Sequence, residues 1–155
     1  MNKWFYLNIL VLIVAIWNGL NSSTLGVHIL LGLLGLFLVL FNWTRHAVFS
    51  TIRSSRDRST KIKLANLSKK IMPFHRWIGT ASLLIIIMHA SLVIFRYGFY
   101  WQNFKMVSGL LTGIILIGMV ATGWMRLFKP SGRLRRFHLR LGILLFFFIV
   151  LHMIF

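Results

Sequence analysis

The chain has 155 residues, of which 58% are hydrophobic, with a mean hydropathy of +0.81 and a formal net charge of +17 at pH 7. This apolar share exceeds that of ordinary soluble domains and predicts a single membrane domain over residues 1–155. Cysteine is absent and Asp57 is the only acidic residue, which excludes disulfides, thiolate-held iron–sulfur clusters and hydrolysis by a carboxylate pair.

Five apolar runs follow one another along the chain, and most approach the length that spans a membrane. They cover residues 4–20, 25–43, 75–95, 106–128 and 138–155. About twenty helical residues cross a hydrocarbon core. The first run follows Lys3 as a signal peptide would, but no small-residue cleavage motif comes after it, so we interpret it as a helix. We therefore predict an all-α integral membrane bundle of five transmembrane helices.

The basic residues indicate how this bundle is oriented. Every lysine and arginine except Arg96 and Lys105 falls on one predicted side, mostly in the segments between the second and third runs and between the fourth and fifth. Short basic segments stay in the cytoplasm, so we expect the N-terminus inside, the C-terminus outside and a basic cytoplasmic loop over residues 45–74. Residues 62–72 would form either an interfacial amphipathic helix or an ordinary part of this loop. The expected location is a cell membrane of the bacterial plasma-membrane type.

The positive charge also bears on partners. The lysine and arginine side chains flank apolar spans, which favours anionic lipid as their binding partner. No zinc or RNA-binding signature accompanies them, so nucleic acid is not expected.

Two histidine pairs have the same spacing, because His75 and His89 are fourteen residues apart and so are His138 and His152. On an α-helix this step returns to within about 40° of the same face and rises roughly 21 Å. Two such helices side by side would bring His75 level with His138, and His89 level with His152. Imidazoles that face each other at two depths are suited to the axial ligation of two b-type haems. The imidazole N–H groups would then need backbone carbonyls or hydroxyls as acceptors, such as those of Thr80, Ser82, Ser91 or Thr112.

Each pair belongs to a longer pattern, His-x3-Gly-x9-His, in which Gly79 and Gly142 lie one turn after the first histidine. A missing side chain at that position would let a flat macrocycle approach the helix, although tight helix packing explains it equally well. Arg76 and Arg140 follow the first histidines closely and could pair with haem propionates, or could serve only to fix the topology.

His28 and His46 are a rival pair, since eighteen residues make five full turns. No second helix repeats that spacing, and both residues lie at the ends of their span. We therefore interpret them as interfacial histidines, with His28 near the outer haem site.

The segments Phe74-His75-Arg76-Trp77-Ile78-Gly79 and Arg136-Phe137-His138-Leu139-Arg140-Leu141-Gly142, each continuing to a second histidine, resemble the ferric reductase-like transmembrane domain. That family includes ferric reductases, NADPH oxidases and the haem-binding membrane subunit of bacterial methionine-sulfoxide reductase, and the resemblance runs from about residue 28 to 155. It implies two b-type haems, held by His75 with His138 and by His89 with His152. Larger members carry a sixth span and a cytoplasmic flavin and nicotinamide domain, neither of which is in this sequence.

These observations favour a transmembrane electron carrier without its own flavin domain. Its electrons would come from a cytoplasmic flavin reductase or a membrane quinol and pass to an extracytoplasmic redox partner or small acceptor. Two alternatives stay open. One is a haem-bearing membrane anchor of a quinol-linked oxidoreductase, and the other is a haem-free structural or metal-transport bundle.

Overall fold

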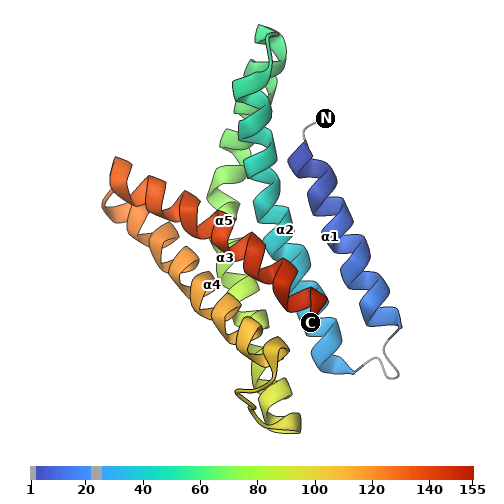
Figure 1. Cartoon of the computed structure of the whole chain (residues 1–155). Coiled ribbons are helices and arrows are strands. Elements are labelled where there is room, and N and C mark those ends of the chain that lie inside the picture. Colours follow the sequence, from blue (N-terminus) through green and yellow to red (C-terminus); the bar gives the residue numbers. More distant parts are fainter. Residues whose placement is uncertain (1–2, 22–25) are drawn as a thin grey trace.

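The chain folds as a helical bundle in a computed structural model that describes residues 3–21 and 26–155. Within these ranges it forms five helices and no strand (Figure 1). They are α1 (Lys3–Leu20), α2 (Val27–Ser54), α3 (Arg58–Tyr97), α4 (Phe104–Phe128) and α5 (Gly132–Ile154). Each is long and apolar enough to span a membrane, which confirms the predicted all-α bundle of five spans. Leu25, where the second span was expected to begin, lies outside the described residues.

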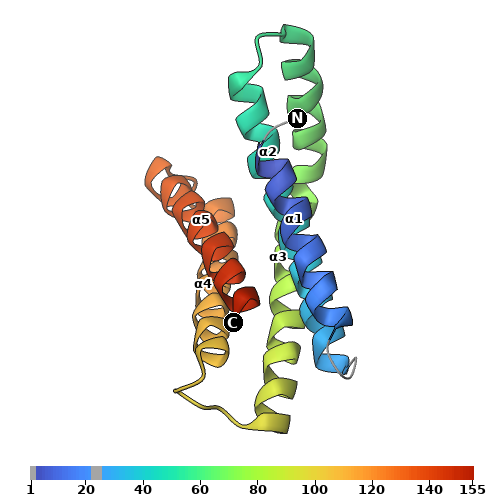
Figure 2. The same ribbon diagram turned by 45° about the vertical axis from the view of Figure 1, so that its right-hand side comes forward.

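The segment predicted to be a basic loop, residues 45–74, is almost entirely helical instead. Only residues 55–57 interrupt the helices, so α2 and α3 form a long helical hairpin. The tip of this hairpin projects beyond the ends of the other helices in both views (Figures 1 and 2). At 1.5 Å per residue the 40 residues of α3 measure about 60 Å, roughly twice the thickness of a hydrocarbon core. The segment was misassigned because charge was taken to indicate a loop, whereas lysine, alanine and leucine are good helix formers.

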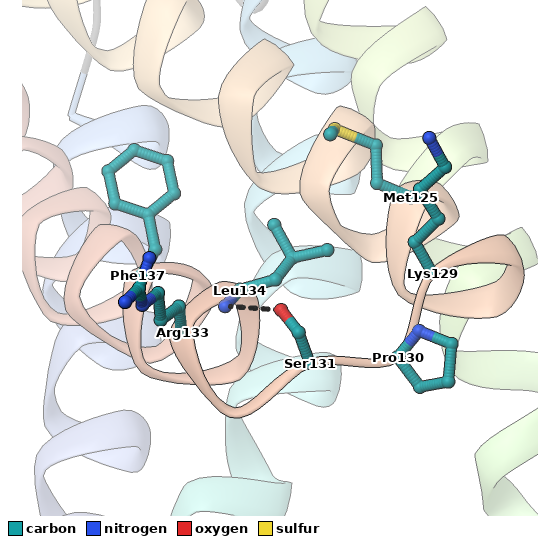
Figure 3. Close-up of a pocket in the computed structure, with 7 residues that line it drawn as sticks. All are labelled: Met125, Lys129, Pro130, Ser131, Arg133, Leu134 and Phe137. Atoms are coloured by element: carbon teal, nitrogen blue, oxygen red, sulfur yellow. Dashed lines mark hydrogen bonds between the residues drawn. The ribbon is translucent and has the colours of Figure 1, made fainter.

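Side-chain caps fix where several helices begin. The carboxylate of Asp57 accepts a hydrogen bond from the backbone N–H of Thr60 at 2.9 Å, at the start of α3. Asn103 caps α4 in the same way. At the start of α5, Ser131 Oγ accepts from the backbone N–H of Leu134 at 3.2 Å (Figure 3). These short polar residues satisfy backbone donors that the first helical turn leaves unpaired.

Pro73 lies inside α3, two residues before His75. It has no backbone N–H, so the carbonyl of Lys69 loses its usual partner four residues on. The proline therefore marks where the basic part of α3 gives way to its apolar part.

The helices pack in chain order, α1 on α2, α2 on α3, α3 on α4, and α4 on α5. Figure 2 shows α1, α2 and α3 as one group and α4 with α5 as a second. The buried apolar core draws on four of the five helices: Val11 and Ala15 of α1, Leu36 and Leu40 of α2, Leu116 of α4, and Leu145 and Ile149 of α5. Helices α3 and α5, which carry the four histidines, are thus held mainly through α2 and α4.

Large apolar side chains cover much of the outer surface. Phe95, Phe104 and Phe128 are 92%, 73% and 75% exposed, and many leucine and isoleucine side chains on all five helices are exposed too. A soluble monomer rarely exposes so much contiguous apolar surface, whereas a bundle in lipid does so throughout. This surface is that expected of a multi-pass membrane protein.

Candidate functional site

The structure brings one predicted histidine pair into contact. His75 of α3 and His138 of α5 have ring centroids 6.4 Å apart, with ring planes at 74°. His138 is 8% exposed and His75 is half-buried. We call these two residues the inner pair. The two rings are in contact although α3 and α5 each pack mainly on other helices. The inner pair therefore bridges the space between α3 and α5.

The separation of the inner pair suits two ligands on opposite sides of one metal ion. Metal–imidazole bonds are about 2 Å long and each ring centre lies about 1 Å behind its nitrogen, which puts the centroids of two axial imidazoles roughly 6 Å apart. The observed 6.4 Å agrees with this value. The pair therefore fits axial ligation of a haem iron.

The hydrogen bonds of His138 determine which of its ring nitrogens is free. Its Nδ1 lies 2.8 Å from Thr122 Oγ1 on α4. The same hydroxyl lies 2.7 Å from the backbone carbonyl of Gly118 and 3.0 Å from that of Met119, to either of which it can donate. When the hydroxyl donates to one of these carbonyls, it accepts from Nδ1 of His138, and Nε2 then has the lone pair that a metal ligand needs.

His75 is held through its backbone. Asn42 of α2 donates from Nδ2 to the carbonyl oxygen of His75 at 3.0 Å. Among the described atoms, the buried Nδ1 of His75 has no hydrogen-bond partner. The ring is positioned by its helix, and its polar edge has unsatisfied bonding capacity.

The second predicted pair, His89 of α3 and His152 of α5, forms the outer pair. Nδ1 of His89 lies 2.6 Å from the backbone oxygen of His28, and Nδ1 of His152 lies 2.9 Å from that of Lys105. A carbonyl oxygen only accepts, so both rings carry their proton on Nδ1 and leave Nε2 free as a ligand. The two side chains are also close enough to interact electrostatically.

Both outer rings lie directly on glycines of a neighbouring helix. A Cβ atom at Gly32 of α2 would come within 3.1 Å of the His89 ring, and one at Gly109 of α4 within 2.8 Å of the His152 ring. Each glycine lies four residues after the residue whose carbonyl accepts the imidazole proton, His28 for Gly32 and Lys105 for Gly109. Sequence reasoning did not find these glycines, although the fixed spacing of four residues is visible in the sequence.

Gly79 and Gly142, which were predicted to admit a macrocycle, face side chains of α2. A Cβ atom at Gly79 would lie 3.4 Å from Asn42 Nδ2, and one at Gly142 would lie 3.0 Å from the ring of Trp43. Helix packing accounts for both glycines, and contact of either with a macrocycle stays a prediction.

The expected hydroxyls are bonded to groups other than the histidine rings. Thr80, Ser82 and Thr112 donate to the backbone oxygens of Arg76, Gly35 and Ser108, respectively. Helical serine and threonine often bond a carbonyl one turn back, which a sequence alone does not distinguish from a bond to a histidine. The type of acceptor was predicted correctly, and the particular residues were not.

The arginines around the inner pair differ in part from those expected. Arg76 is half-buried and its guanidinium carbon lies 5.7 Å from the ring centroid of Trp124. Arg140 is exposed. Arg45 of α2 and Arg126 of α4, which were assigned only to the cytoplasmic side, interact electrostatically with both inner rings.

The rival histidines have other surroundings. The ring of His46 stacks on Trp43 at 4.9 Å between centroids and contacts the edge of Trp4. The ring of His28 contacts Tyr97, and its backbone oxygen is the acceptor for His89. His28 therefore lies near the outer pair, as expected, but acts there through its backbone.

A surface hollow of about 560 Å³ lies at the turn between α4 and α5 (Figure 3). Its lining is Met125, Lys129, Pro130, Ser131, Arg133, Leu134 and Phe137. None of the four histidines lines it, so it is separate from the candidate site.

In the part of the chain that the structure describes, no three histidine, cysteine, aspartate or glutamate residues form a group that could hold a bare metal ion. A haem iron would need only two protein ligands, because the porphyrin supplies the others. Comparison of the chain with protein-family models, curated proteins and solved structures gave no match.

Proposed function

We propose that this protein is a di-haem b-type cytochrome that carries electrons across a membrane. The observation that carries the proposal is the inner pair, whose rings lie 6.4 Å apart with their planes at 74°, on two helices that pack mainly on different neighbours. Histidines buried among apolar helices are costly and usually mark function.

The outer pair supports a second site. His89 and His152 follow the inner pair by fourteen residues on their helices, a rise of roughly 21 Å, which places the two pairs at different depths. Their Nδ1 atoms are bonded to backbone oxygens, as is typical of histidines that ligate a metal through Nε2. Two sites at two depths are what transfer across a bilayer requires.

The residues of the chain determine the kind of chemistry. Bound haem would supply one-electron oxidation and reduction. Two histidines at each site leave no open coordination position, which favours reversible electron transfer over oxygen binding at iron. The chain itself holds the rings of His89 and His152 in the tautomer that leaves Nε2 free, through backbone carbonyls.

The direction of transfer follows from the charges. The basic hairpin formed by the ends of α2 and α3 would lie in the cytoplasm, with the inner pair near that side and the outer pair near the opposite face. A cytoplasmic flavin reductase or a membrane quinol would be the donor, and an extracytoplasmic protein or small molecule the acceptor. The resemblance to the ferric reductase-like transmembrane domain, in the segments around His75 and His138, agrees with this assignment.

The visible spectrum of the purified protein tests the proposal. We expect a reduced-minus-oxidised spectrum of six-coordinate b-type haem. His89→Ala or His152→Ala should remove one haem and spare the other, while His46→Ala, a histidine stacked on tryptophan, should leave both. Protein made with ample haem that nevertheless has no haem spectrum would favour the haem-free bundle, and retention of both haems in the His89→Ala and His152→Ala variants would refute the pairing.

A further inference from the structure

Three arginines from three helices surround the inner pair. Arg76 follows His75 directly on α3, and Arg45 lies three residues after Asn42, which bonds the His75 carbonyl. Arg126 lies four residues after Thr122, which bonds the His138 ring, so the three arginines come from the turns of α2, α3 and α4 next to those that contact the inner pair. Arg45 and Arg76 are half-buried, whereas Arg126 is exposed. Like charges gathered in this way repel one another unless an anion lies among them.

The chain supplies no such anion. Its one acidic residue, Asp57, lies at the tip of the α2–α3 hairpin, where Ser59 and Thr60 donate hydrogen bonds to its carboxylate. A half-buried guanidinium without a counter-ion is unfavourable. An anion bound from outside the chain would supply the missing negative charge.

Several buried polar atoms of α2 and α3 have no hydrogen-bond partner. Within the described residues, Nε of Arg45, Nε of Arg76, Nε1 of Trp43 and Oγ of Ser68 are buried and have no hydrogen-bond partner. Each of them can donate a hydrogen bond. Ser68 is only 6% exposed, and it lines with Arg45 and Asn42 a cavity of about 80 Å³ between α2 and α3. Buried polar groups are normally satisfied, so a set of unsatisfied donors indicates a missing acceptor.

We infer that Arg45, Arg76 and Arg126, together with the unpaired donor of Ser68, form a site beside the inner pair that binds an oxyanion from outside the chain. Arginine forks and hydroxyl donors are the groups that recognise carboxylates and phosphates. Two sources share this chemistry. One is a propionate of the proposed inner haem, which rests on the proposed function, and the other is the phosphate of an anionic lipid, which does not.

The first arm of the test uses haem-free protein. Haemin and haemin dimethyl ester, whose propionates are uncharged, are titrated into the wild type and into Arg45→Gln. If a propionate is the anion, Arg45→Gln should bind haemin about 10-fold more weakly and the ester unchanged, since a charge-assisted hydrogen bond is lost only with haemin. Arg53→Gln is the matched control, because it removes the same charge at an exposed position of the same helix.

The second arm needs no haem. Thermal unfolding is followed in mixed micelles that contain either phosphatidylglycerol or phosphatidylcholine. If a lipid phosphate is the anion, phosphatidylglycerol should raise the Tm of the wild type and of Arg53→Gln, and this rise should be lost in Arg45→Gln. Arg126→Gln, at an exposed position that the fold tolerates, should act in the same direction if Arg45→Gln does not fold.

The inference is overturned if Arg45→Gln and Arg126→Gln behave like Arg53→Gln in both arms. Failure of the wild type to bind haem would instead count against the proposed function, and the lipid arm alone would then decide the anion site.

Discussion

Replacement of Gly109 by alanine tests whether close approach of a ring to a helix is required at the outer site. The new Cβ atom would lie 2.8 Å from Cε1 and 3.1 Å from Nδ1 of His152. The ring would have to move by several tenths of an ångström, and its hydrogen bond of 2.9 Å to the carbonyl of Lys105 would lengthen or break. Gly109→Ala should therefore weaken ligation by His152 without touching the inner pair.

The magnitude follows from two terms. Overpacking costs about 1–3 kcal/mol and the lost hydrogen bond about 0.5–1.5 kcal/mol, so about 1.5–4.5 kcal/mol is expected, or a loss of at least about 10-fold in the affinity for the outer haem. Alanine is also a better helix former than glycine by roughly 0.5–1 kcal/mol, which raises helix stability in any such variant. The control variant must therefore also replace a helical glycine by alanine.

Gly113→Ala provides this control, because it lies one turn further along α4 and no described atom beyond its own helix lies within 4 Å of the new Cβ. The assay is the haem content per protein by pyridine haemochrome, together with a redox titration that resolves the two haems. Gly109→Ala should lose the outer haem and Gly113→Ala should retain both. Equal haem content in the two variants would refute the role assigned to the glycine.

Three further outcomes follow from the hydrogen bonds. Thr122→Val removes the acceptor of His138 Nδ1 and should weaken inner haem binding by about 10-fold in a haemin titration, whereas Thr122→Ser should not. His28→Ala should keep the outer haem, because only the backbone oxygen of His28 bonds the ring; a haem content that falls by half would contradict this. Hydrogen bonds from Thr60 and Ser59 hold the pKa of the Asp57 carboxyl well below its usual range. The cap therefore stabilises α3 fully above about pH 4, and this stabilisation is lost as the pH falls through the lowered pKa. Asp57→Ala should lower hydrogen-exchange protection at the start of α3 at pH 5, and Asp57→Asn, which can still cap, should not.

The features that could be predicted from the sequence depend on the positions of residues along a single helix. The number of spans follows from the length of apolar runs, and the equal spacing means that once His75 lies beside His138, His89 and His152 share a second level. Neither requires knowledge of which helix packs on which. The hairpin was missed for a related reason, since positive charge indicates the side of the membrane but does not indicate whether the backbone is helical.

The features that sequence did not predict depend on which helices are neighbours. Thr122 bonds His138 because α4 packs beside α5, and Arg45 reaches the inner pair because α2 packs beside α3. No spacing within a single helix relates these residues. Only the order of packing, with α2 and α4 beside the helices that carry the histidines, brings them together.

One rule of helix geometry relates positions within a helix to contacts between neighbouring helices. In a helix the side chain at position i+4 points back over the carbonyl of residue i, so a glycine there exposes the second lone pair of that carbonyl to a donor on a neighbouring helix. Among the described residues the arrangement occurs three times. His28 and Gly32 receive His89, Lys105 and Gly109 receive His152, and His75 and Gly79 receive Asn42.

The rule also explains how this chain orients imidazoles without carboxylates. A buried histidine is commonly fixed by an aspartate or glutamate, and this sequence has none within its spans. A carbonyl next to a glycine provides a neutral acceptor at no cost in buried charge. Both members of the outer pair are bonded in this way, so the glycines at positions 32 and 109 determine the tautomer of the outer histidines as well as their distance from the helix.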